Sequence, residues 1–107
     1  MHERDTPLTV RAAPAEPYIH LDNRGLVLHD GRAATIFLGP TLPWVAQTLE
    51  VLLDERRATR HQHQHVLGGF IAEGGAATLF AGAPDRLVTL RTDEPTLAEV
   101  VRRLRGR

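Results

Sequence analysis

The spacing of apolar residues after Pro40 constrains the fold more than any other feature of this chain. Aliphatic side chains recur there at intervals of three and four residues, at Leu42, Val45, Ala46, Leu49, Leu52 and Leu53. This spacing places them along one side of an α-helix, so the sequence predicts an amphipathic helix over residues 42–58 with one face in the core. Thr41 can cap its first turn, and Pro43 lies where the helix needs no backbone N–H.

The predicted helix ends in a basic segment that runs into a histidine-rich connection, ATRHQHQH. Arginines at positions 56, 57 and 60 suit a helix C-terminus, because the unpaired carbonyl groups there favour cations. Trp44 and Val51 add a second apolar line on another side of the helix. Either a wide core or a partner chain covers that line. The predicted partner-binding residues are therefore Trp44, Val51, Arg56, Arg57 and Arg60.

Turn-forming residues divide the segment before the helix into three short strands, predicted over residues 18–22, 26–29 and 33–38. The dipeptide Asp30-Gly31 predicts a two-residue turn between the last two, with His29 opposite Arg32. Both faces of this hairpin carry apolar residues, so both are predicted to be buried. The two faces are Val27, Ala34 and Ile36 on one side, and Leu26, Leu28 and Phe37 on the other.

Three more strands and a second helix are predicted after the central helix. The strands cover residues 66–72, 76–81 and 86–91, and the helix is marked by Leu97, Val100, Val101 and Leu104. Either Asp93 or a capping box of Thr96 and Glu99 starts that helix. Glycine and alanine are frequent in the first two of these strands. Small side chains let other backbones approach closely, which favours a flat packing surface or a pairing edge.

Together these elements predict an α+β fold with a single, mostly antiparallel sheet, in the order β-β(-β)-α-β-β-β-α. Residues 17–107 are long enough for one domain, and residues 1–16 are polar and interrupted by proline, which predicts a flexible tail. The sequence contains no apolar run long enough for a membrane span or a signal peptide. A cytoplasmic protein is therefore expected.

Three residue types are missing, and their absence excludes several kinds of chemistry. The 107 residues include no Cys, no Ser and no Lys, so all 13 basic residues are Arg. Without Cys there is no disulfide, thiolate metal site or cysteine nucleophile. Without Ser and Lys there is no serine triad, Schiff-base lysine or P-loop lysine. The formal net charge is zero, so any charged binding surface must be local. No cofactor is expected.

Histidines at alternate positions form the predicted metal site, which consists of His61, His63 and His65. In an extended segment, alternate residues share a face, so two imidazoles can meet one ion. In a helix, His61 and His65 lie one turn apart and can do the same. Zinc, nickel or copper would suit these ligands. Further ligands must come from elsewhere, with His20, Asp22, His29 and Glu73 as candidates. The alternative is a solvated connection that suits a helix C-terminus.

A second alternative is nucleic-acid binding by the arginines that end the last helix. These are Arg102, Arg103, Arg105 and Arg107. Arginine binds phosphate with two parallel hydrogen bonds, so a basic stripe forms if both helix ends converge. Acidic residues lie beside both clusters, which favours instead a solvated face that compensates the helix dipoles. His20 with Asp22, and His29 with Asp30, are candidate acid–base pairs, although the sequence shows no pocket around them.

With no complete catalytic set, the sequence predicts a non-enzymatic domain that acts by self-association and by binding protein partners. An adaptor, regulatory or structural role fits this reading. A homodimer is expected, either through an exposed strand edge or through the side of the first helix that carries Trp44. Divalent metal binding and nucleic-acid binding remain the two alternatives.

Overall fold

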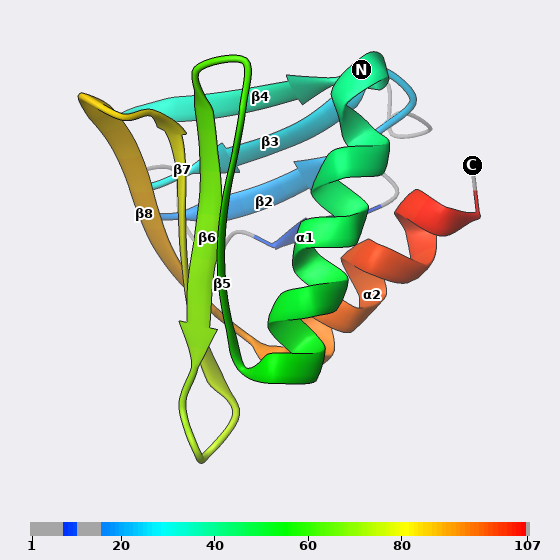
Figure 1. Ribbon diagram of the computed structural model, residues 1–107, viewed down its shortest axis with the longest axis vertical. Helices are drawn as coiled ribbons and strands as arrows, with labels where there is room; N and C mark the ends of the chain where they lie inside the picture. The colour runs from blue at the N-terminus through cyan, green and yellow to red at the C-terminus, as the bar shows by residue number, and fades with distance from the viewer. Residues whose placement is uncertain (1–7, 11–15, 107) are drawn as a thin grey trace.

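The computed structural model describes residues 8–10 and 16–106, and it has the predicted α+β class with antiparallel strands (Figure 1). Sheet A has the strand order β1-β2-β3-β4, and sheet B has the order β5-β6-β7-β8. The strands of sheet A are β1 (Leu8–Val10), β2 (Tyr18–Leu21), β3 (Gly25–His29) and β4 (Ala34–Leu38). Those of sheet B are β5 (Arg57–Gln62), β6 (His65–Ile71), β7 (Ala76–Ala83) and β8 (Arg86–Asp93).

The strands form two sheets rather than the single sheet predicted. Every pairing joins consecutive strands, so no backbone ladder crosses the helix between β4 and β5. The sheets meet by packing instead: β3 contacts β8, β4 contacts β7, and the hydroxyl of Thr35 donates to the carbonyl of Ala81 at 3.2 Å. Sequence patterns mark strands but not which strands pair across a long connection, and this explains the difference.

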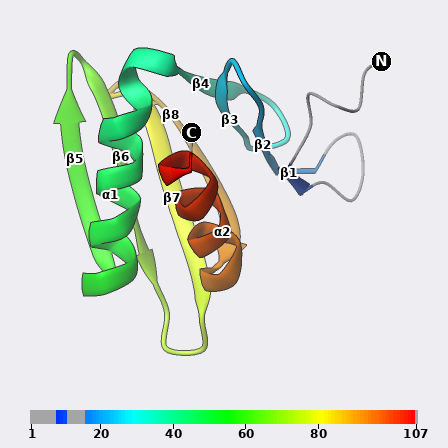
Figure 2. The same ribbon diagram turned by 90° about the vertical axis from the view of Figure 1, so that its right-hand side faces the viewer.

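Two helices cover one face of sheet B, as Figure 2 shows. They are α1 (Leu42–Glu55) and α2 (Glu94–Arg105). The apolar stripe predicted for the first helix is buried at Leu42, Val45, Ala46, Leu49 and Leu52. The core lies between this stripe, α2, the inner face of sheet A and the helix-side face of sheet B. Neither helix has the length and hydropathy needed to cross a bilayer, within the part of the chain that is described.

The first helix ends three residues earlier than predicted, and the connection that follows it is a strand. Arg56 adopts a left-handed conformation (φ 68°), its N–H donates to Leu52 O, and Arg57 already belongs to β5. This strand contains only one aliphatic residue, Ala58, so no apolar alternation marked it in the sequence. The predicted Thr41 cap is wrong as well: a 3₁₀ turn, Gly39–Thr41, precedes α1, and the Thr41 side chain makes no capping bond.

The second helix begins as one of the two alternatives predicted. Asp93 is its N-cap, and a carboxylate oxygen of Asp93 accepts from the backbone N–H of Thr96 at 2.9 Å. This hydrogen bonding lowers the pKa of Asp93 below its usual value. The predicted flexible tail is only partly within the described residues. Its residues 8–10 form β1, and residues 1–7 and 11–15 lie outside them.

The hairpin of β3 and β4 has the predicted faces but a longer loop. His29 pairs with Ala34 rather than with Arg32. Because the register differs by two residues, each side chain keeps its face. The prediction that both faces are buried is wrong, however. Phe37 is 1% exposed, whereas Ile36 and Leu38 are 55% and 58% exposed, because β4 is the end strand of sheet A and no helix covers its outer side.

Candidate functional site

The structure does not bring the three predicted metal-binding histidines together. His61 lies opposite Val66 and points to the outer face of sheet B, whereas His65 pairs with Gln62 and lies on the helix side, where its ring contacts Phe37 at 6.1 Å. His63 is in the turn between them. Within residues 8–10 and 16–106, no group of three or more His, Cys, Asp or Glu side chains is arranged to hold a metal ion. The metal hypothesis is therefore not carried into the proposed function.

The basic cluster predicted at the end of α1 is divided between three environments. Arg56 forms an ion pair with Glu94 at the start of α2 (2.7 Å). Arg57 is exposed on the outer face of sheet B, and Arg60 lies on the opposite, helix-side face. Side chains an odd number of positions apart on a strand point to opposite faces, so these two arginines do not form one cluster.

The arginines at the end of α2 are paired with carboxylates. Arg102 and Arg103 both hydrogen-bond to Glu99, and these bonds lower the pKa of Glu99 to about 2. Arg105 reaches Glu50 on α1, with 2.8 Å between Nε and a carboxylate oxygen. Arg107 lies outside the described residues. Much of the charge that was predicted to contact nucleic acid is thus compensated within the chain.

The predicted partner-binding residues of α1 are partly covered by the chain itself. Trp44 is half-buried and packs against the core, with its ring 6.2 Å from that of Phe37. Val51 is also half-buried. The large exposed apolar side chains lie on the sheets instead, among the described residues: Ile36, Leu38, Phe70 and Leu87.

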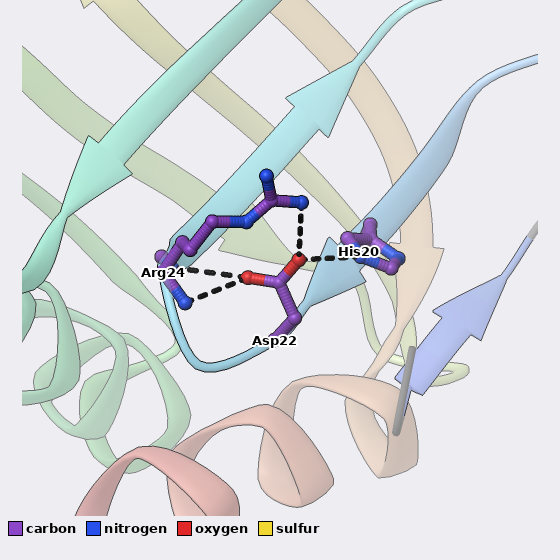
Figure 3. Close-up of polar contacts among 4 residues, drawn as sticks. His20, Asp22 and Arg24 are labelled. Carbon is purple, nitrogen blue, oxygen red and sulfur yellow. Dashed lines mark hydrogen bonds and ion pairs between the residues drawn. The ribbon is translucent and has the colours of Figure 1, made fainter. Parts of the chain in front are cut away.

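His20 and Asp22 do contact each other, in the turn between β2 and β3 (Figure 3). Asp22 is 4% exposed, and one of its oxygens accepts from His20 Nε2 and from the Arg24 guanidinium, each at 3.1 Å. The other oxygen accepts the backbone N–H of Arg24 at 2.8 Å and that of Gly25 at 3.3 Å. Burial raises the pKa of Asp22, but these hydrogen bonds outweigh burial and lower its pKa to about 2. The carboxylate therefore fixes the turn in place.

A pocket of about 210 Å³ lies beside this cluster on the outer side of sheet A. The cluster forms its polar end, and Val27, Ile36 and Leu38 form its apolar wall. The second predicted pair is not joined. The ring of His29 stacks on Tyr18 at 4.8 Å and accepts the N–H of Gly31, while Asp30 accepts two N–H groups of its own turn.

The outer face of sheet B carries two of the four large apolar side chains that are exposed among the described residues. Its cross-strand rows follow from the register: Arg57, Phe70, Thr78 and Arg91 in one row; Thr59, Gly68, Phe80 and Thr89 in the next; His61, Val66, Gly82 and Leu87 in the third. Phe70, Phe80 and Leu87 therefore lie on a diagonal across β6, β7 and β8. We call these three residues the apolar diagonal. Phe70 is 49% exposed and Leu87 is 44% exposed.

Glycine makes the middle of this face flat. A Cβ atom at Gly68 would lie 2.7 Å from the ring of Phe80 and 2.6 Å from the carbonyl oxygen of Ala58. The Phe80 ring thus rests on the bare backbone of Gly68. The glycine-rich strands were predicted to let another backbone approach, whereas the group that approaches Gly68 on this face is a side-chain ring.

Among the described residues, the arginines around this face have no carboxylate partner. Arg57 and Arg91 occupy its two sides, on β5 and β8, and neither takes part in an ion pair among the described residues. Uncompensated arginines next to exposed aromatic rings are typical of protein-binding surfaces. Alternation along each strand indicates in the sequence that Phe70, Phe80 and Leu87 lie on one face of their strands. Whether that face is exposed depends on which side of the sheet the helices cover.

Comparison of the chain with protein-family models, with curated protein sequences and with solved structures gives no match.

Proposed function

We propose that this chain is a non-enzymatic protein-binding domain that self-associates through the outer face of sheet B, in an adaptor, regulatory or structural role. The observation that supports the proposal is the apolar diagonal, with two large side chains close to half exposed on a flat face. Isolated apolar residues are common on protein surfaces, whereas a contiguous group framed by polar residues marks an interaction site.

The arrangement of charge suits a second copy of the same face. Arg57 and Arg91 lie on the outermost strands of the sheet, and the centre of the face is uncharged. Two such faces can pack about 10 Å apart, as in other stacked sheets, and bring the aromatic rings together without opposing arginines at the centre. A two-fold interface uses the same patch on both subunits, so one surface is sufficient. The predicted cytoplasmic location is part of this proposal and rests on the sequence alone.

Light scattering and sedimentation velocity at high micromolar concentration test the proposal. The unmodified chain is expected to form a dimer, and Phe70→Ser with Leu87→Ser is expected to be monomeric with unchanged circular dichroism. The matched control is Ile36→Ser with Leu38→Ser, because those two apolar residues are exposed on sheet A, at 55% and 58%. A control variant that dissociates while the sheet B variant does not would place the contact on sheet A. A chain that is monomeric throughout would refute self-association.

A further inference from the structure

The strand β5 is the open edge of sheet B. It is the first strand in the order β5-β6-β7-β8, and no described strand pairs with its other side. The other long end strands lie against the opposite sheet, since β8 contacts β3 and β4 contacts β7. Figure 2 shows β5 as the outermost strand, with α1 over one face rather than over the edge.

The backbone of this edge has donors and acceptors directed outward. In an antiparallel ladder, residues that exchange hydrogen bonds with the neighbour alternate with residues whose N–H and C=O groups point away. Ile71 N donates to Arg56 O at 2.9 Å, which sets the phase of the alternation. Arg57, Thr59 and His61 therefore present their backbone groups to the open side, as a template for one more strand.

The side chains of β5 disfavour edge-to-edge pairing with β5 of a second copy of the chain. Arg57 and Arg60 project to opposite faces of the strand, and neither is paired with a carboxylate in the described part of the chain. Pairing β5 with itself would place two basic strands side by side, each with Arg57 on one face and Arg60 on the other. Basic residues on an edge strand are a known protection against such self-pairing. The same charges favour an incoming strand that is acidic.

We propose that β5 accepts an extended acidic segment of a partner protein as an additional strand of sheet B. The six residues of β5 extend for roughly 20 Å, so the segment needs about six residues. Its carboxylates lie beside Arg57 on the outer face and beside Arg60 on the helix side, and its backbone pairs with the outward groups of Arg57, Thr59 and His61. This site is separate from the apolar diagonal, so it does not require self-association.

Fluorescence anisotropy with two labelled peptides tests the charge requirement. The probe is Glu-Val-Glu-Glu-Val-Glu, and the control peptide has Lys at each Glu position. The glutamate peptide is expected to bind the unmodified chain, more weakly as salt is raised, and the lysine peptide is not. Arg57→Glu with Arg60→Glu is expected to lower the affinity for the glutamate peptide roughly tenfold, since two exposed ion pairs become repulsive. The same variant is expected to bind the lysine peptide more tightly than the unmodified chain does. Equal binding of both peptides, or no effect of the charge reversal, would overturn the proposal.

Backbone changes test strand addition as opposed to simple charge attraction. Thr59→Pro removes an outward N–H without removing a bond to β6, and Thr59→Val is its control. The proline variant is expected to lose the peptide, with circular dichroism confirming that it is folded. N-methylation of alternate peptide residues gives the same test without altering the chain, and one of the two methylation frames is expected to abolish binding. Binding that survives both methylation frames would refute strand addition.

Two further measurements distinguish strand addition at β5 from self-association and from nucleic-acid binding. Peptide binding by the Phe70→Ser, Leu87→Ser variant is expected to be unchanged, which would support the edge site whether or not the chain dimerises. A single-stranded oligonucleotide of the same charge serves as the competing ligand. Binding of the oligonucleotide by the unmodified chain, with no binding of the glutamate peptide, would assign these arginines to nucleic acid and overturn the proposal.

Discussion

The outer faces of the two sheets differ in how their charges are used. On sheet A, the carboxylate of Asp22 is buried and accepts hydrogen bonds from His20, Arg24 and Gly25. On sheet B, Arg57 and Arg91 lie in the same cross-strand row as the exposed Phe70 and form no ion pair among the described residues. Charges that are satisfied within the chain stabilise it, whereas uncompensated charges cost little to leave in water and remain available to a partner.

This comparison changes which residues are candidates for function. In the sequence, His20 and Asp22 are a candidate acid–base pair. In the structure, Asp22 stabilises a turn, and its carboxylate oxygens accept hydrogen bonds from donors within the chain. Arg57 was predicted to bind a partner only as one of several cations at the end of a helix. Its place on an open strand edge is what makes it a candidate for binding.

The largest expected effect on stability is at Asp22. We predict that Asp22→Asn lowers the free energy of unfolding at pH 7 by roughly 2 kcal/mol, from the fall in the pKa of this carboxyl from 3.8 to about 2. Because the folded-state pKa lies below the unfolded one, the stabilisation is complete above pH 4 and is lost as pH falls through about 2. Urea unfolding followed by Trp44 fluorescence checks this. A difference between the two proteins that stays constant from pH 7 to pH 2 would show that the ionised carboxylate is not responsible.

Substitutions in the turn between β5 and β6 are expected to raise the free energy of unfolding, by less than Asp22→Asn lowers it. His63 and Gln64 both have positive φ, 49° and 69°, where glycine and asparagine are strongly preferred. His63→Asn with Gln64→Gly should therefore raise the free energy of unfolding by about 1 kcal/mol, because the left-handed conformation is costly for other residues. His63→Ala, which keeps the strain, is the control. Thermal unfolding measures both, and no gain in the Asn-Gly variant would indicate that the turn is not strained.

The smallest effect is predicted for the uncompensated arginines of sheet B. Arg57→Ala and Arg91→Ala should each change the free energy of unfolding by less than about 0.5 kcal/mol, since neither side chain has a charged partner to lose. Urea unfolding under the same conditions as for Asp22→Asn makes the comparison direct. A decrease in the free energy of unfolding as large as that of Asp22→Asn would mean that these arginines stabilise the fold. The two faces would then not differ in how their charges are used.

The fold was predictable where the pattern is local. The stripe of α1 from Leu42 to Leu52, the turns around Gly25 and Gly75, and the Asp93 cap all depend on residues within a few positions of one another. The β3–β4 hairpin shows the limit, since its faces were predicted correctly with a register that was two residues out. The predicted helix end at residue 58 failed because Arg56 adopts a conformation usually taken by glycine.

The candidate site was less predictable. The sequence identified residues by type, and it correctly brought His20 next to Asp22, but it grouped His61 with His65 although the strand register places them on opposite faces. It also assigned Arg57 and Arg60 to one cluster, although these two residues lie on opposite faces of β5. Side-chain type is visible in a sequence, whereas the face on which a side chain lies requires the strand and its partner to be known.

By itself, the sequence determined the α+β class, the two amphipathic helices and the exclusion of cysteine, serine and lysine chemistry, because composition and short-range periodicity are properties of neighbouring residues. Only the tertiary structure decided that the strands form two sheets, that residues 57–62 are an open edge, and that Phe70 and Leu87 stay exposed. Those outcomes depend on contacts between segments far apart in the chain, and burial of one face of a sheet is settled only when the helices pack against it.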